Sequence, residues 1–137
     1  MIGDIVGKGG RKTLQKLLPT IIKENQINFV IAQGENSAGG FGITKKTSKD
    51  FFDSGVDVIT SGNHIWDKKE TTEFILKEDR LLRPENLAQG SPGNGYGIYF
   101  TKDKKFKYLS IEHGLINRLG KCFPKGLFDF FFLLQVF

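Results

Sequence analysis

The chain has 137 residues, of which 39% are hydrophobic and 26% charged, and its formal net charge is +5. These values are typical of an ordinary globular domain or part of one, and they exclude extended disorder. No apolar run approaches the roughly 20 residues that span a bilayer, the N-terminus lacks the features of a signal peptide, and the single Cys122 cannot form an internal disulfide, so we expect a cytoplasmic protein without a membrane partner.

The first predicted elements alternate as strand, glycine-rich loop and helix, which is typical of an α/β sandwich. Residues 1–6 predict a short apolar strand that ends near the loop GKGG. Leucine and isoleucine at helical spacing predict an amphipathic helix over residues 11–25, which Pro19 should kink or split. Residues 27–32 (INFVIA) predict a buried strand, which the loop QGENSAGGFG closes.

The next elements repeat this order. Thr44 is a candidate N-cap for a helix that runs to about Ser54 and stops at Gly55. Residues 56–60 (VDVIT) predict a third strand, directly followed by SGNH.

The spacing of Asp67 and Glu70 is that of a capping box and predicts a helix over residues 68–77. Two short strands are expected at residues 81–84 and 96–101. The segment between them, residues 86–95, is expected to be a turn-rich loop. The lysines of this region lie among acidic residues, which favours a solvated surface over a nucleic-acid patch. RNA is therefore not indicated as a partner, although the basic charge is compatible with a phosphate-bearing substrate.

Polar side chains follow each of the first three predicted strands. They are Asp4, then Glu35 and Asn36, then Asn63 and His64. Because ligands of open α/β sheets bind beyond the carboxyl ends of the strands, these residues are expected to converge there. Taken singly, each has an ordinary interpretation: Asp4 and Asn63 as turn residues, and His64 as a structural histidine.

Together these residues have the chemistry of a two-metal site. Asp4, Glu35 and Asn63 offer oxygen ligands to two divalent cations, which could activate a water and stabilise charge on a phosphoryl group. His64, beside the metals and not bound to them, could protonate a leaving oxygen. The glycine-rich loops match neither the P-loop nor the dinucleotide-binding pattern, which disfavours a GTPase or a Rossmann dehydrogenase.

Four motifs occur in order along residues 1–105: GDIVGKGGR, GENSAGGFGIT, SGVDVITSGNHIWDKKE and LLRPENLAQGSPGNGYGIY. In these motifs the chain resembles the YmdB-like bacterial metallophosphoesterases. That family resembles the calcineurin-like phosphoesterases and is similar in activity to 2′,3′-cyclic-nucleotide phosphodiesterases. The resemblance implies a small phosphodiester or cyclic-nucleotide substrate.

Carried onto this sequence, the resemblance implies that Asp4 binds the first metal, Glu35 bridges both, and Asn63 binds the second. Asn36 would bind or orient, and His64 would be the proton donor. The metals implied are iron or manganese, with magnesium as an alternative.

The chain departs from the family pattern at both ends. The family begins with more apolar residues before GD, and it continues much further with additional histidine ligands. We therefore expect residues 1–105 to be the N-terminal half of a metallophosphoesterase domain, truncated, and 106–137 to be an aberrant or divergent tail, of the kind that an out-of-frame translation produces. The tail contains His113, which we treat as incidental, and ends in the aggregation-prone run FDFFFLLQVF.

Three hypotheses follow. The parent protein would hydrolyse a phosphodiester with two metals and with His64 as general acid, while this chain by itself would be an inactive fragment. Alternatively, the chain is a metal- or nucleotide-binding fragment without turnover, or a non-functional product.

Overall fold

The computed structural model describes residues 1–101, 105–109 and 135–136. Its central feature is a parallel sheet whose strands lie in the order β1-β2-β3. The bounds of these strands are Ile31–Gln33 for β1, Val58–Thr60 for β2 and Leu81–Leu82 for β3. Because the strands are parallel, the loops that follow them leave the sheet at one edge. The predicted α/β class is confirmed.

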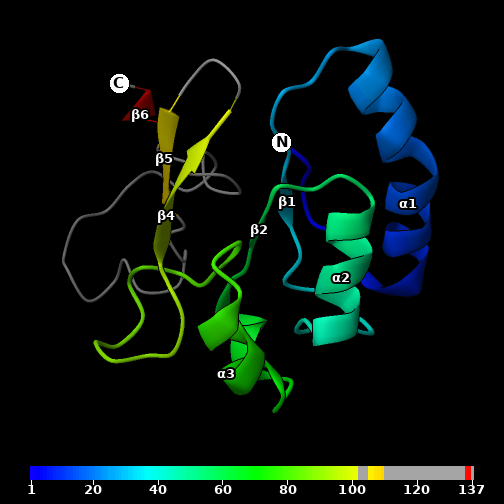
Figure 1. Cartoon of the computed structure of the whole chain (residues 1–137). Coiled ribbons are helices and arrows are strands. Elements are labelled where there is room, and N and C mark those ends of the chain that lie inside the picture. Colours follow the sequence, from blue (N-terminus) through cyan, green and yellow to red (C-terminus); the bar gives the residue numbers. More distant parts are fainter. Residues whose placement is uncertain (102–104, 110–134, 137) are drawn as a thin grey trace, which may run out of the picture.

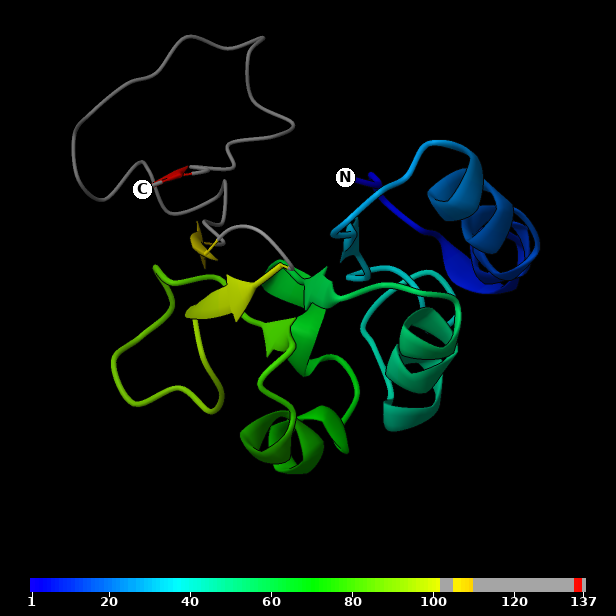
Figure 2. The same cartoon turned by 45° about the horizontal axis from the view of Figure 1, so that its top comes forward.

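Helices cover one face of this sheet (Figure 1 and Figure 2), where α1 and α2 lie on the same side of the parallel strands. The helical segments are α1 (Gly7–Glu24), α2 (Lys45–Asp53), the 3₁₀ turn η1 (Asn63–Trp66), α3 (Thr71–Phe74) and the 3₁₀ turn η2 (Ile75–Lys77). Their apolar side chains form the main core with alternate residues of the sheet, including Ala32, Ile59 and Leu81.

A second, antiparallel sheet has the order β4-β5-β6 and lies on the other side of the parallel strands (Figure 1). Its strands are β4 (Tyr96–Phe100), β5 (Lys105–Leu109) and β6 (Gln135–Val136). Tyr99 of β4 packs on Phe29, with ring centroids 5.8 Å apart, beside the buried Ile31, Val58 and Leu82. Burial, with the nearby Asp79 carboxylate, raises the pKa of Tyr99 to about 12, so the phenol stays neutral.

The middle strand β2 is therefore buried on both faces, since Val58, Ile59 and Thr60 are all almost fully inaccessible to solvent. This is the usual environment of a parallel strand with layers packed on both sides. The Thr60 hydroxyl is buried without a hydrogen-bond partner among the described residues. Within the same residues, no helix is long and apolar enough to cross a membrane.

Some predicted boundaries are confirmed. The helix capped by Thr44 forms as α2 and ends at Asp53, just before Ser54 and Gly55. The strand predicted at residues 96–101 forms as β4. The strands predicted at 27–32, 56–60 and 81–84 form, but they are shorter or shifted, as β1, β2 and β3.

The N-terminal predictions are partly wrong. Residues 1–6 form no continuous strand: Ile2 forms an isolated parallel bridge to Ala32 of β1, and the Ile5 amide donates to the Gln33 carbonyl of β1 at 3.2 Å. The helix α1 begins at Gly7, not at residue 11, and it runs through Pro19 without being split. Because proline has no backbone N–H, Pro19 leaves the carbonyl of Gln15, four residues earlier, without its helical hydrogen bond. Both residues are exposed, so water can bind that carbonyl. The predicted change of character near residue 106 falls largely outside the described residues, and the domain boundary stays a prediction.

The N-cap of α2 can be tested by substitution. The Thr44 hydroxyl accepts a hydrogen bond from the Thr47 amide at 3.1 Å, and the Thr47 hydroxyl accepts one from the Thr44 amide at 2.8 Å. We expect Thr44→Ala to lower the free energy of unfolding by about 1 kcal/mol, measured by urea denaturation, because one side of this capping box is lost. Thr44→Ser keeps the hydroxyl and should restore most of the loss. A Thr44→Ala midpoint equal to that of the wild type would contradict the capping role.

Candidate functional site

The Glu35 carboxylate joins the loop after β1 to the loop after β2. Its Oε1 accepts a hydrogen bond from the backbone N–H of His64 at 3.1 Å. Gln33 holds the same residue from the other side, because its Nε2 donates to Glu35 Oε2 at 3.3 Å and its Oε1 accepts from the Glu35 amide at 2.9 Å. Glu35 is thus positioned at the carboxyl edge of the sheet by three contacts.

Gly62 makes this approach possible. A Cβ atom placed on Gly62 would lie 2.1 Å from Glu35 Oε2 and 2.4 Å from its Cδ. No side chain can occupy that space while the carboxylate stays where it is. The residue before Asn63 must therefore be glycine for Glu35 to reach the second loop.

Asp4 and Asn36 form a second contact at the same edge. Asn36 Nδ2 lies 3.0 Å from both carboxylate oxygens of Asp4 and donates to them. Asn36 also accepts, through its backbone carbonyl, from the amides of Gly7 and Gly40 at 2.9 and 3.2 Å. Asn36 directly follows Glu35 in the chain, so its hydrogen bonds hold Asp4 close to the loop that carries Glu35. In this arrangement the Asn36 amide group orients Asp4.

His64 is paired with Asp67, which corrects one prediction. Asp67 does not cap a helix: α3 begins only at Thr71, and its N-cap Glu70 makes no side-chain cap hydrogen bond. Asp67 Oδ2 instead lies 2.6 Å from Nδ1 of His64. Both side chains are substantially exposed, at 42% and 38%, so water weakens the electrostatic part of the pair. Its main effect is to orient the imidazole.

Asn63 is the candidate that the contacts constrain least. It begins η1 between Gly62 and His64 and is exposed, and within residues 1–101 its side chain forms no hydrogen bond with the other four candidates. Its position at the strand end agrees with the prediction.

Three residues have supporting roles that the sequence did not indicate. Gln33 brackets Glu35, and Asp67 faces His64, a pairing that the three-residue spacing along one turn could have suggested. Arg11 donates from Nη1 to the Ser37 carbonyl, and its Nε lies 3.4 Å from Asp50 Oδ2. Arg11 thereby ties the loop after β1 to both α1 and α2.

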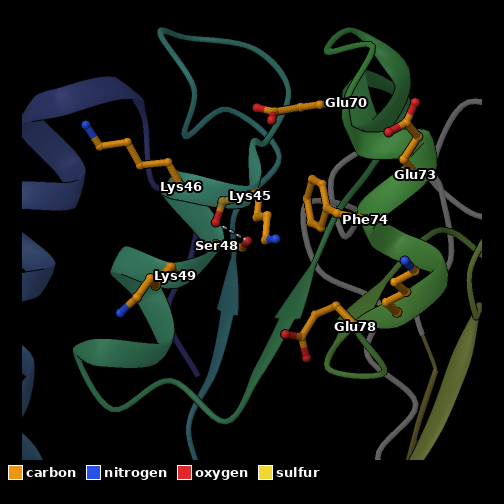
Figure 3. Close-up of a pocket in the computed structure, with 9 residues that line it drawn as sticks. Lys45, Lys46, Ser48, Lys49, Glu70, Glu73, Phe74 and Glu78 are labelled. Atoms are coloured by element: carbon orange, nitrogen blue, oxygen red, sulfur yellow. Dashed lines mark hydrogen bonds between the residues drawn. The ribbon is translucent and has the colours of Figure 1, made fainter.

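A separate groove of about 840 Å³ lies between α2 and the segment of α3 and η2 (Figure 3). Its walls carry charges of both signs, and Phe74 points from α3 toward Lys45 and Ser48 of α2 (Figure 3). None of the five predicted site residues lines it. The strand-end cluster is therefore distinct from this groove, whose mixed charges select no single class of ligand.

The donor chemistry at the strand ends fits divalent cations. Asp4, Glu35, Asn36 and Asn63 present carboxylate and amide oxygens, which hard cations prefer. The Glu35 carboxylate occupies the space that a Cβ would fill on Gly62, the residue that precedes Asn63 in the chain. Among the described residues, no group of three or more His, Cys, Asp or Glu side chains is arranged to hold a metal ion. These residues would therefore supply part of a coordination shell.

The fold is an α/β fold shared with solved structures, one of which is named a phosphatase. The structure is similar to the crystal structure of a novel phosphatase from Mycoplasma pneumoniae, with a TM-score of 0.74 and 29% identity, covering 80% of this chain and 40% of that one. A hypothetical protein from Thermus thermophilus is similar to the same degree, with a TM-score of 0.73 and 30% identity over 80% of this chain and 42% of that one.

The chain belongs to the YmdB-like protein family, whose family model matches residues 1–131. It is 38% identical over 128 residues to the 2′,3′-cyclic-nucleotide 2′-phosphodiesterase of Bacillus subtilis (strain 168). That match covers 93% of this chain and 46% of the relative, so the chain spans less than half the length of that protein. The predicted family resemblance is confirmed.

The close approach at Gly62 yields a test with an internal control. Gly62→Ala should force the Glu35 side chain to rotate away and break its hydrogen bond to the His64 amide. We expect amide hydrogen exchange at His64 to accelerate by about tenfold or more, measured by NMR, since a hydrogen bond to a charged group is lost.

Gly9→Ala is the matched control, because a Cβ at Gly9 meets nothing within 4 Å. It should leave exchange at His64 unchanged. Equal exchange rates in the wild type and Gly62→Ala would show that Glu35 does not hold this amide.

Proposed function

We propose that the protein to which this chain belongs hydrolyses phosphodiesters in a metal-dependent reaction, with 2′,3′-cyclic nucleotides as the substrate class. The observation that carries the proposal is the contact of the Glu35 carboxylate with Gly62 and the His64 amide. It brings the Glu35 carboxylate and the backbone of His64 together at one edge of the sheet. The similarity to a named cyclic-nucleotide phosphodiesterase supports the choice of substrate.

The residues that would hold two divalent cations are Asp4, Glu35, Asn36 and Asn63, with Glu35 between the two. Iron or manganese is the expected metal, with magnesium as the alternative. When bound, such ions supply an activated water and positive charge for the phosphoryl oxygens. Gln33 and Asn36 keep the carboxylates of Glu35 and Asp4 in place through the hydrogen bonds described above.

His64 is the proposed proton donor to the leaving oxygen. His64 would act in its imidazolium form, in which Nδ1–H donates to Asp67 Oδ2 and Nε2–H holds the proton to be transferred. Asp67 acts through His64 and is a positioning residue.

A second candidate function is binding of metal or nucleotide without turnover. It is favoured by the partial donor set, since the described residues contain no cluster of three acidic, histidine or cysteine ligands. Manganese-dependent hydrolysis of 2′,3′-cyclic AMP, followed by chromatography of the products, separates the two. Product formation supports the hydrolase, whereas calorimetric binding of manganese without product supports the binding function.

The bridging role of Glu35 predicts a joint loss. Glu35→Gln should lower both turnover and bound manganese, measured by elemental analysis after desalting, because the neutral amide weakens the hold on both ions. Glu73→Gln, on an exposed acidic residue of α3, is the matched control and should change neither. Unchanged metal stoichiometry in Glu35→Gln would refute the bridging role.

The proton-donor role of His64 predicts dependence on the leaving group. His64→Ala should lower the hydrolysis rate of a substrate with an alkoxide leaving group by about 10²–10⁴-fold, with metal content nearly unchanged. The loss should shrink for bis(p-nitrophenyl) phosphate, whose leaving group needs little protonation. Asp67→Asn should show the same pattern with smaller losses. An equal loss on both substrates would favour a purely structural role for His64.

A further inference from the structure

Phe41 is an exposed aromatic residue beside the proposed site. It is 48% exposed, and its ring packs against the ammonium group of Lys68, whose Nζ lies 3.8 Å from the ring centroid. The other cation–π pair found among the described residues differs, because Phe52 of that pair packs on the main core. Phe41 belongs to neither of the hydrophobic clusters that the described residues form.

The loop that carries Phe41 is anchored to the site at both ends. At its start, the Asn36 carbonyl accepts from the Gly40 amide, and Asn36 also contacts Asp4. At its end, the Gly42 carbonyl accepts a hydrogen bond from the Ala38 amide at 2.9 Å. This bond joins residues before and after Phe41. The aromatic ring is therefore held on an ordered loop that begins at a candidate metal-binding residue.

The far end of this loop lies against the His64 turn. Gly42 has a φ of +71°, and a Cβ there would lie 3.3 Å from the His64 carbonyl oxygen and 2.9 Å from Lys68 Cγ. The hydroxyl of Thr71 donates to the carbonyl of the next residue, Ile43, at 2.7 Å. Phe41, which precedes Gly42, and Lys68 thus lie beside the turn that carries His64.

We infer that Phe41 is the stacking platform for the base of a bound nucleotide, and that Lys68 leaves the ring to contact the phosphate of the same molecule. The inference rests on the proposed function and identifies residues that would select a nucleotide over a phosphoester without a base. Stacking of a base on an aromatic ring is stronger than an exposed ammonium–phenyl contact, so the base can displace Lys68. The released ammonium lies on the segment that carries His64 and is a suitable cation for phosphate.

The test compares two phosphate monoesters that differ in the base. Adenosine 3′-monophosphate and glycerol 2-phosphate are titrated into the 137-residue chain with manganese by calorimetry. We expect the wild type to prefer the nucleotide by about tenfold and Phe41→Ala to lose this preference while still binding glycerol phosphate. Phe41→Trp should keep the preference, and Lys68→Met should weaken both ligands.

Leu76→Ala is the matched control, since Leu76 is an exposed apolar residue of η2 outside the site, and it should change neither affinity. A nucleotide preference that survives in Phe41→Ala would overturn this inference but not the proposed function. Equal binding of both monoesters by the wild type would do the same and leave the proposed function intact. Failure of the wild-type chain to bind either monoester, together with no hydrolysis of 2′,3′-cyclic AMP by the protein to which the chain belongs, would overturn both.

Discussion

The parallel pairing of β1 with β2 is the constraint on which the candidate site depends. Ile31, Ala32 and Gln33 lie opposite Val58, Ile59 and Thr60, respectively. With this register, the residues that follow the two strands leave the sheet side by side, and Glu35 can reach the backbone of Gly62 and His64. Burial of β2 on both faces stabilises the register, because a shift by one residue would exchange the side chains of the two apolar layers.

Short polar contacts then complete the arrangement. Glu35 is held by Gln33 and by the His64 amide, Asp4 by Asn36, and the His64 imidazole by Asp67. Each candidate side chain except Asn63 is thus oriented by a neighbour. Such support reduces the conformational freedom that a bound ion or substrate would otherwise have to remove.

The composition of the site favours oxygen-ligand chemistry over nucleophilic catalysis by a side chain. Its acidic and amide groups lie at the strand ends, while its single imidazole is turned toward Asp67. Part of the basic charge of the chain lies on the lysines of α2 that line the separate groove. One lysine, Lys68, lies close to the site, and it rests on Phe41. The arrangement therefore separates groups that would bind metal from groups that would contact a nucleotide.

The sequence by itself determined the class of fold, the family and the positions of the candidate side chains, because apolar strands and the polar residues at their ends are local patterns. It also placed the Thr44 cap correctly, since a capping box needs only neighbouring residues. It failed where a side chain has two possible partners: the spacing of Asp67 predicts a helix cap, but tertiary packing turns its carboxylate to His64. It also failed at residues 1–6, where contact with β1 is limited to the bridge of Ile2 and one backbone hydrogen bond from Ile5. Only the tertiary structure decided that Glu35 lies over Gly62 and that Phe41 lies beside the His64 turn, because these contacts join residues from separate loops, and their proximity depends on how the strands pair.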